Sequence, residues 1–403
     1  MKVIKVLLIS HNPFSTYQSM GKTFASLFSE FEKKEVCQLY VYPSFPNIDM
    51  ANSYYRITDM DAMKNIFPFR QEGGTVNTHE YAGGMIEDSK NAKYYAQKSN
   101  NMPLKRLIRD AVWKMSHWYS KKVKQWIDKE APDCIFLAPG YAKFIYDIAL
   151  KIAKVKKIPI ITYICDDYYF LTPPKNLIGK YQQWLLRAKI CRVMRKTKLL
   201  IAISEEIACL YSKEFKVKTQ LIMTGSNFET CGEVTQKVTA RSLSYFGNMG
   251  INRDKSLADI GMALDEINDK NNTDYRLKIY TNLNGSYVPS IFKEIRSVEF
   301  CGFLVGEEFE REFMNADCLV HVEAFDSDSI DLVKGSISTK IADSLVSGIP
   351  LLAYCPSGVA SVEHLRRNQC AFIANNYEGL QSALRDILQD RSEERRVGKE
   401  CYS

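Results

Sequence analysis

The chain has 403 residues, of which 46% are hydrophobic and 25% are charged, and its formal net charge is +7. This length exceeds one ordinary hydrophobic core, and the apolar content with 23 tyrosines excludes extended disorder. The modest positive charge favours anionic small ligands or an anionic surface, and it argues against a protein dedicated to binding nucleic acid.

The cysteines and the apolar runs argue against disulfide-rich, metal-binding, secreted and membrane-spanning proteins. The 11 cysteines are scattered, without a Cys-x-x-Cys pair or a Cys/His cluster at metal-ligand spacing. We therefore expect no disulfide framework, no bound metal and a reducing, cytoplasmic environment. The first apolar run is too short for a signal peptide, and no stretch of about 18 apolar residues predicts a membrane-spanning helix.

Short apolar runs alternate with amphipathic stretches through the first half of the chain. This alternation predicts βαβ units and a parallel sheet that is covered by helices on both faces. Prolines and glycine pairs interrupt residues 43–100, which we interpret as an elaborated surface region. The runs that predict strands are 3–9, 37–42, 134–137, 159–164, 199–203 and 221–223.

The loop after the first run is a candidate acceptor site. Residues 10–23 are mostly polar, and they follow the carboxyl end of a parallel strand, where such sheets bind ligands. His11 either acts as an acid–base residue or caps local structure. Gly21-Lys22-Thr23 is similar to the end of a Walker A loop, but Thr16 stands where that motif needs glycine, which disfavours a nucleoside triphosphatase.

Two predicted helices are strongly basic. Residues 105–129 contain Trp113, Trp118 and Trp126, and residues 180–198 contain seven lysines and arginines with no acidic residue. Basic faces with tryptophan are typical of helices on an anionic membrane surface, but the solvated faces of core-packed helices have a similar composition. Peripheral contact with the inner face of a membrane is therefore one of two open interpretations.

Two adjacent carboxylates end the run at 159–164. Asp166 and Asp167 follow Cys165 at the sheet edge, where they either act on a sugar hydroxyl or cap the next helix. Because no second acidic cluster accompanies them, a two-metal site is disfavoured.

A second series of apolar runs predicts a second parallel sheet. Residues 227–240 between the two series are polar and have no helical period, as in a linker. We expect an N-terminal Rossmann-like domain over 1–226 and a C-terminal one over 241–390. The charge-dense residues 391–403 are interpreted as a non-native or disordered tail. The second series comprises 242–246, 277–280, 298–300, 318–322, 350–354 and 370–373.

A glycine turn follows the first strand of the second series. Gly247 and Gly250, with Asn248 between them, allow the backbone to approach a ligand. Arg253 and Lys255 then place positive charge near a diphosphate, and the arginine fork suits two phosphate oxygens. The alternative is an ordinary loop with solvated basic residues.

Residues 335–354 predict a short helix followed by a buried strand. Ser336, Ser338 and Thr339 are candidate N-cap residues, and the N–H groups of the first turn, with Lys340, suit an anionic phosphate. Asp343 lies one turn further and can accept hydrogen bonds from ribose hydroxyls. The alternative is a surface helix with a weak ion pair between Lys340 and Asp343.

Together, these segments resemble the GT-B glycosyltransferases, in particular the large retaining family with many bacterial polysaccharide and lipopolysaccharide transferases. The resemblance covers about residues 1–388 and is sharpest over 243–354. The family has a Glu-x7-Glu motif before a Gly-x-Pro turn; Asp343 matches the second glutamate, and Gly335 stands at the first. The resemblance implies an α/β fold with two Rossmann-like domains that face a cleft.

The resemblance also implies roles for the candidate residues. Asp166, Arg253 and Lys255 would be catalytic, with Cys165 in place of a family histidine, and the transfer would use a UDP- or GDP-linked sugar, a glycan or lipid-linked hydroxyl acceptor and no metal or cofactor. The alternatives are a nucleotide-sugar 2-epimerase and a catalytically silent binding module. The donor set is Gly247, Asn248, Gly250, Glu323, Ser338, Thr339, Lys340 and Asp343, and the acceptor set is His11, Gly21 and Asp167.

Overall fold

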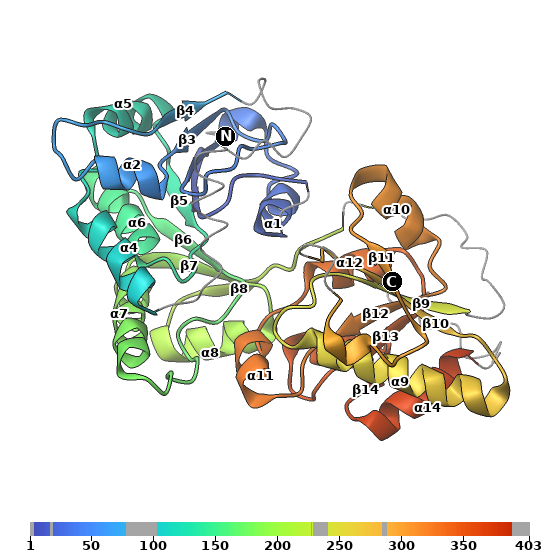
Figure 1. Cartoon of the computed structure of the whole chain (residues 1–403). Coiled ribbons are helices and arrows are strands. Elements are labelled where there is room, and N and C mark those ends of the chain that lie inside the picture. The colour runs from blue at the N-terminus through green and yellow to red at the C-terminus, as the bar shows by residue number, and fades with distance from the viewer. Residues whose placement is uncertain are drawn as a thin grey trace. The chain divides into compact units, whose positions relative to one another are not determined.

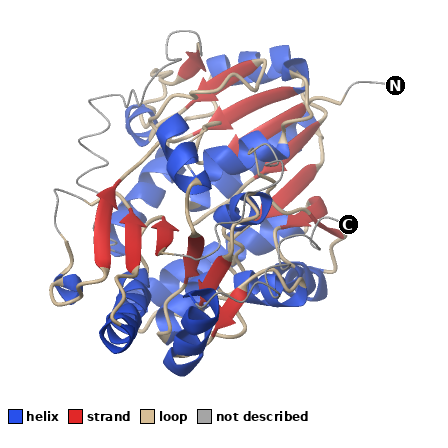
Figure 2. Cartoon of the chain, turned by 90° about the vertical axis from the view of Figure 1, so that its right-hand side faces the viewer, coloured by secondary structure: helices blue, strands red, loops and turns tan. Residues whose placement is uncertain are grey.

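The computed structural model describes residues 4–16, 19–77, 103–226, 228, 241–283 and 288–388 (Figure 1). The chain divides into two compact units, Met1–Thr224 and Gly225–Ser403, which we call unit 1 and unit 2. The expected linker at 227–240 lies outside the described residues except for Phe228, and the expected tail at 391–403 lies wholly outside them. In each unit the strands are flanked by helices (Figure 2).

Unit 1 contains an eight-stranded sheet in the order β4-β3-β2-β1-β5-β6-β7-β8. Its neighbouring strands are parallel except for the antiparallel pair β3 and β4. The chain adds strands on one side of β1 and then on the other, so the topological switch point lies between β1 and β5. The strands are β1 (Val6–Ser10), β2 (Val36–Tyr40), β3 (Ser53–Arg56), β4 (Gly74–Val76), β5 (Cys134–Leu137), β6 (Ile160–Ile164), β7 (Thr197–Ala202) and β8 (Thr219–Leu221).

Part of residues 43–100, where we expected an elaborated surface region, belongs instead to the sheet and its core. Strands β3 and β4 extend the sheet, and Tyr54 and Tyr55 of β3 are buried. A strand of four residues is too short to show a hydrophobic pattern that separates it from a loop, even with two buried tyrosines. Residues 78–100 lie outside the described part of the chain.

The helices of unit 1 correct one further expectation. The basic segment 105–129 is two helices, because Ser120 starts a new one and its Oγ accepts a hydrogen bond from the N–H of Val123 at 3.4 Å. The helices are α1 (Ser19–Leu27), η1 (Lys33–Glu35), α2 (Asp59–Lys64), α4 (Pro103–Met115), α5 (Lys121–Glu130), α6 (Lys143–Lys156), α7 (Leu177–Met194) and α8 (Glu205–Phe215).

Two of the three tryptophans in that segment are core residues. Trp113 stacks on Phe144, with ring centroids 4.0 Å apart, and its Nε1 donates to Oδ1 of Asp59 at 2.8 Å. Trp126 is buried as well, and its Nε1 donates to Oγ of Ser53 at 2.9 Å. These indole rings therefore do not form a membrane-facing surface, which corrects that part of the expectation.

Unit 2 contains a six-stranded, wholly parallel sheet in the order β11-β10-β9-β12-β13-β14. The order reverses at β9, so the switch point lies between β9 and β12. The strands are β9 (Ser242–Phe246), β10 (Arg276–Tyr280), β11 (Val298–Gly302), β12 (Cys318–Val322), β13 (Leu351–Tyr354) and β14 (Phe372–Ala374).

Both faces of the unit 2 sheet are covered. Leu243 and Tyr245 of β9 pack in the cluster that includes α9 and α14, whereas Phe246 packs in the opposite cluster with Ile341 of α12 and Leu365 of α13. This alternation is the period of two expected of a strand between two helical layers. The helices are α9 (Arg253–Asn271), η4 (Ser290–Phe292), α10 (Gly306–Met314), α11 (Ser327–Val333), α12 (Thr339–Val346), α13 (Ala360–Arg367) and α14 (Tyr377–Leu388).

Among the described residues, no helix combines the length and the apolar character needed to cross a membrane.

Candidate functional site

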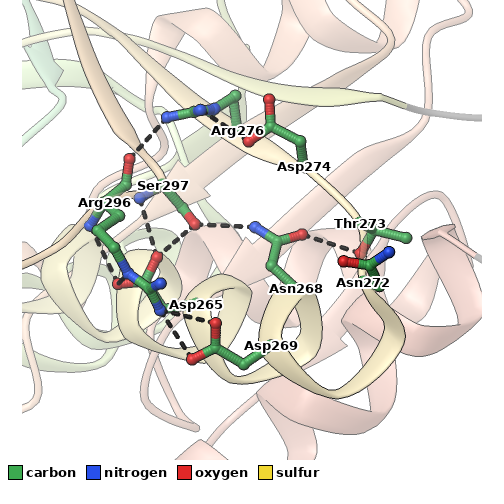
Figure 3. Close-up of a pocket in the computed structure, with 9 residues that line it drawn as sticks. All are labelled: Asp265, Asn268, Asp269, Asn272, Thr273, Asp274, Arg276, Arg296 and Ser297. Carbon is green, nitrogen blue, oxygen red and sulfur yellow. Dashed lines mark hydrogen bonds and ion pairs between the residues drawn. The ribbon is translucent and has the colours of Figure 1, made fainter.

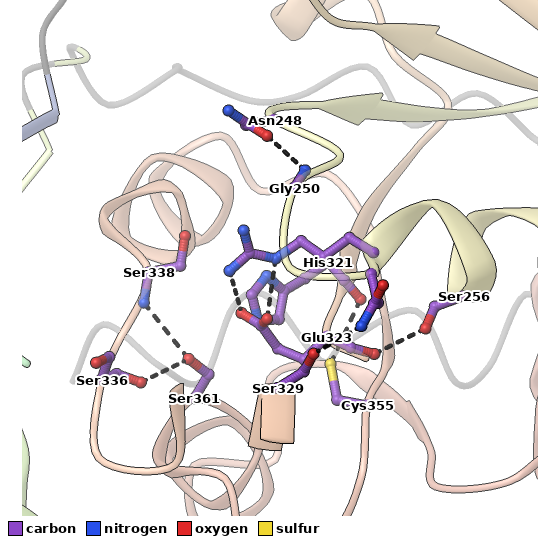
Figure 4. Close-up of polar contacts among 12 residues, drawn as sticks. Asn248, Gly250, Ser256, His321, Glu323, Ser329, Ser336, Ser338, Cys355 and Ser361 are labelled. Atoms are coloured by element: carbon purple, nitrogen blue, oxygen red, sulfur yellow. Dashed lines mark hydrogen bonds and ion pairs between the residues drawn. The ribbon is translucent and has the colours of Figure 1, made fainter. Parts of the chain in front are cut away.

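The candidate site lies at the carboxyl edge of the unit 2 sheet, at the switch point between β9 and β12. The chain leaves β9 through the turn at 247–252 and leaves β12 through residues 323–326. Open parallel sheets bind ligands at this edge, because the loops on the two sides of the switch point separate there. Figure 4 shows polar side chains from both loops directed toward one another.

An ion pair links the two loops. Nε of Arg253 lies 2.9 Å from Oε2 of Glu323, and Nη2 lies 3.0 Å from Oε1, so the pair is bidentate. Glu323 is 3% exposed and follows β12, while Arg253 is the first residue of α9. Burial acts to lower the pKa of Arg253, but the Glu323 carboxylate raises it and the net shift is upward. The Arg253 guanidinium is therefore charged at neutral pH.

A buried histidine borders this pair. Nε2 of His321, on β12, lies 3.9 Å from Oε1 of Glu323. Burial lowers the pKa of His321 to about 4; Glu323 acts to raise it, while Arg253 and Lys340 act to lower it. The imidazole is consequently neutral at physiological pH and adds no charge to the site.

The turn before α9 has a strained backbone. Ile251 and Asn252 both lie in the left-handed region, with φ of 60° and 55°. A β-branched residue there costs roughly 1–3 kcal/mol, which the surrounding contacts must offset. Nδ2 of Asn252 donates to Oδ2 of Asp326 at 3.0 Å and to Oγ of Ser329 at 3.2 Å. These bonds fix the turn against the start of α11.

Asp326 serves as the N-cap of α11. Its Oδ1 accepts from the N–H of Ser329 at 3.0 Å, and its Oδ2 accepts from Asn252. The backbone N–H of Ser329 is the main cause of the lowered pKa of Asp326. Its carboxylate is thus engaged by the protein.

Gly247 makes room for a lysine. A Cβ at this position would overlap Nζ of Lys340 and would lie 2.8 Å from Oη of Tyr245. Oη of Tyr245 in turn donates to the carbonyl oxygen of Asn248 at 2.7 Å. The structure therefore brings Gly247, Asn248 and Lys340, which were selected from distant parts of the sequence, to one edge of the sheet.

The start of α12 lies where the sequence predicts it, but the expected side-chain cap is absent. Ser338 occupies the N-cap position without a capping bond from its hydroxyl. Its backbone N–H instead donates to Oγ of Ser361 at 3.4 Å, and that hydroxyl donates to the carbonyl of Ser336 at 3.1 Å (Figure 4). Thr339 is half-buried and Lys340 is exposed in the first turn. Ser361 was missed in sequence because it lies 23 residues from Ser338.

Asp343 is buried, and its Oδ1 accepts a hydrogen bond from Oγ of Ser226 at 2.7 Å. The same hydroxyl accepts from the N–H of Phe228 at 3.1 Å. Asp343 thus holds the first residues of unit 2, and contact with a ribose stays a prediction. Lys255 is exposed on the first turn of α9. Arg253, which was expected to bind the diphosphate together with Lys255, is bonded to Glu323.

The two carboxylates after β6 in unit 1 differ in their surroundings. Asp166 is half-buried, and its Oδ2 accepts from Oη of Tyr168 at 3.1 Å. Asp167 is 4% exposed, and its Oδ1 accepts from the N–H groups of Tyr169 and Phe170 and from Oη of Tyr211 at 2.9–3.0 Å. Asp167 therefore fixes the turn that follows it, and it does not cap the next helix, because the N-cap of α7 is Asn176.

The loop after β1 is tightly packed in unit 1. A Cβ at Gly21 would lie 2.6 Å from the carbonyl oxygen of Pro13, so the glycine allows α1 to approach the loop. The ring of His11 packs edge-on against Tyr42, with centroids 5.5 Å apart. Buried Gln38 on β2 anchors this loop, since its Nε2 donates to the carbonyl of Asn12 at 3.1 Å. In the sequence, this anchoring role of Gln38 is signalled by the presence of one amide side chain within an apolar run.

A polar pocket of about 340 Å³ lies at the opposite, amino edge of the unit 2 sheet (Figure 3). Nη2 of Arg296 bonds both carboxylate oxygens of Asp269 at 2.7 and 2.9 Å, and Asp265 accepts from the N–H groups of Arg296 and Ser297. We interpret these contacts as a structural network that joins α9 to the start of β11. Across the described ranges, no group of three or more His, Cys, Asp or Glu could hold a metal ion.

Comparison with known proteins identifies the fold. No protein-family model matches the sequence, and no curated protein sequence matches it. Sucrose-phosphate synthase from Thermosynechococcus elongatus superposes with a TM-score of 0.60 at 11% identity, covering 99% of this chain and 93% of that one. WaaG, a glycosyltransferase involved in lipopolysaccharide biosynthesis, gives 0.55 at 12% identity, with coverage of 99% and 94%. The chain has the GT-B fold.

A third GT-B structure has a donor analogue bound. Trehalose-6-phosphate synthase from E. coli, bound with UDP-2-fluoro glucose, superposes with a TM-score of 0.57 at 9% identity, covering 98% of this chain and 94% of that one. Identities this low establish the fold alone.

Proposed function

We propose that this GT-B chain is a glycosyltransferase that moves a sugar from a UDP- or GDP-linked donor to a hydroxyl acceptor. The observation that carries the proposal is the charged cluster at the switch point of unit 2, where the Arg253–Glu323 pair and Lys340 lie at the turn containing Gly247. A diphosphate needs convergent cations, backbone N–H groups and close backbone approach, and this edge offers all three.

In the proposed reaction, the bond between the sugar and the diphosphate breaks, and negative charge develops on the leaving phosphate. Groups that bind this charge more strongly in the transition state than in the bound donor accelerate the step. Lys340 would supply a full charge, and the first turn of α12 would supply N–H groups and the positive end of the helix dipole. The bonds to Glu323 use Nε and Nη2 of Arg253, so its Nη1 can donate to a phosphate oxygen.

Glu323 would act as a positioning residue. Its two oxygens face Arg253, and its carbonyl accepts from Oγ of Ser256 at 2.8 Å. A guanidinium held at two nitrogens has a fixed plane, which lowers the entropy lost when it binds a phosphate. Asp343 remains the proposed ribose contact and Asp166 the proposed catalytic group toward the acceptor.

The remaining features of the proposal rest on likeness to the family. The transfer would need no metal, would retain the anomeric configuration and would use a glycan or lipid-linked acceptor in the cytoplasm. WaaG, with the same fold, is a glycosyltransferase of lipopolysaccharide biosynthesis, which supports a role in cell-surface polysaccharide or glycolipid synthesis.

Incubation with UDP-glucose, UDP-N-acetylglucosamine and GDP-mannose without an acceptor tests the proposal. We expect slow hydrolysis of one donor to free sugar and nucleoside diphosphate, because water replaces the acceptor in a site that stabilises the leaving group. Chromatography of the products distinguishes the alternatives. Recovery of a donor inverted at carbon 2 would identify an epimerase, and donor that binds but stays intact would identify a binding module.

A further inference from the structure

Helix α4 in unit 1 has apolar side chains on its solvent side. Its core side is defined by Trp113, which stacks on Phe144, and by Arg109, whose Nε lies 2.8 Å from Oδ1 of Asp59. Leu104, Ile108 and Met115 are nevertheless exposed. At 100° per residue, these three positions fall within about 40° of one another and about 140–180° from Trp113. They form a continuous stripe that is turned away from the core.

Helix α7 has the same two-sided pattern. Leu186 and Ile190 face the core, while Leu177 is 82% exposed and Trp184 is 63% exposed. Tyr181 lies between these two on the exposed side, and its ring stacks on that of Trp184, with centroids 5.9 Å apart. The stripe on α7 is therefore aliphatic at the start of the helix and aromatic one turn later.

The two stripes belong to neighbouring helices. Helices α4 and α7 contact each other, and both contact α6 (Figure 1). Because the core-facing side chains of each helix are buried in unit 1, both stripes lie on the outer side of one helical layer. We call their residues, Leu104, Ile108, Met115, Leu177, Tyr181 and Trp184, the α4–α7 patch.

The charge around the α4–α7 patch identifies its partner. Lys105 and Lys114 on α4, and Lys180 and Arg192 on α7, are exposed beside the stripes. Asp110 is the one acidic residue on these two helices, and its Oδ2 lies 2.6 Å from Nζ of Lys143, so it is neutralised locally. An apolar stripe with tryptophan and tyrosine, flanked by lysine and arginine, has the composition of a helix face that lies in the interface of an anionic bilayer.

We infer that unit 1 binds the surface of an anionic membrane through the α4–α7 patch. The apolar side chains enter the headgroup region, and the flanking basic residues bind lipid phosphates. The tryptophan that enters the interface is Trp184, whereas Trp113 and Trp126 stay in the core. This surface lies in unit 1, and the inference stands independently of the donor site proposed in unit 2.

Flotation of the full chain with lipid vesicles tests the inference. Vesicles of phosphatidylcholine with about 30 mol% phosphatidylglycerol are expected to carry the wild-type chain, and pure phosphatidylcholine vesicles are not. About 0.5 M NaCl should weaken the binding, because salt screens the basic residues. The double variant I108S/W184S is expected to lower the partition coefficient about tenfold or more, since it removes two large apolar side chains from the interface.

The matched control is F303S/V305S, which removes an exposed aromatic and an exposed aliphatic residue from unit 2. It should bind vesicles as the wild type does. The inference is overturned if the wild-type chain fails to float with anionic vesicles, or if I108S/W184S floats as well as the wild type. It is also overturned if sedimentation shows that I108S/W184S converts a dimer to a monomer, because the patch is then a protein interface. Donor hydrolysis in solution, measured on the same variants, reports separately on the proposed function.

Discussion

Replacing Glu323 by alanine is expected to lower the stability of unit 2 by about 3 kcal/mol. The substitution leaves the Arg253 guanidinium in a largely buried position without its carboxylate, and the lost solvation of an unpaired charge exceeds the lost packing of the side chain. Thermal unfolding followed by circular dichroism should show a midpoint lowered by about 6–12 °C in the transition of this unit.

A second variant separates the burial of charge from the loss of function. R253M/E323L replaces the pair by apolar side chains of similar length, so its midpoint should return close to that of the wild type. Its donor hydrolysis should stay low, because the phosphate-binding guanidinium is gone. D269A is the matched control, since it breaks a pair in which Nη2 of Arg296 bonds both oxygens of Asp269 and both side chains are exposed, and it should barely move the midpoint. A midpoint for E323A equal to that of D269A would contradict a buried ion pair.

Replacing Lys340 by methionine is expected to lower the rate of donor hydrolysis about 10²-fold with little change in stability. Nζ of Lys340 lies beside Gly247, where it can reach a phosphate, and the side chain is exposed, so its loss creates no cavity. Methionine keeps most of the length and removes the charge. The measurement is the release of nucleoside diphosphate under donor saturation, together with the thermal midpoint.

Lys270 provides the control for this substitution, because it is exposed on the last turn of α9, at the amino edge of the sheet. K270M should hydrolyse the donor at the wild-type rate, and K340R should retain more activity than K340M. Equal rates of donor hydrolysis for K340M and K270M would show that Lys340 does not stabilise the leaving group.

Much of the fold could be predicted from sequence because parallel strands buried on both faces are continuous apolar runs. All 12 predicted runs correspond to strands, and those at β5, β9 and β12 have the same ends as in the structure. Strands β3 and β4 were not predicted, because each is short and lies at or near the edge of the sheet. The break between α4 and α5 was not predicted, because the five polar and aromatic residues between these helices do not interrupt a helical pattern as proline or glycine would.

The candidate site could be predicted in part. Gly247, Arg253 and Lys340 were selected from local patterns, and the structure places them at one sheet edge. The pairing of Arg253 with Glu323 spans 70 residues, and the bond from Asn252 to Asp326 spans 74. Side-chain contacts of this kind depend on the register of β9 with β12, which no local pattern encodes. The burial of Asp167 and Asp343 could not be foreseen either, because each packs against a residue distant in the sequence, Tyr211 for Asp167 and Ser226 for Asp343.

The central claim is that the diphosphate of a nucleotide binds at the carboxyl edge of the unit 2 sheet. Hydrogen–deuterium exchange with mass spectrometry tests it directly, using whichever of UDP, GDP, ADP or CMP raises the thermal midpoint most. We predict slower exchange in peptides covering 247–256 and 336–343, and unchanged exchange in peptides covering 265–276 at the amino edge. Protection at 265–276 with none at 247–256 or 336–343 would contradict the account.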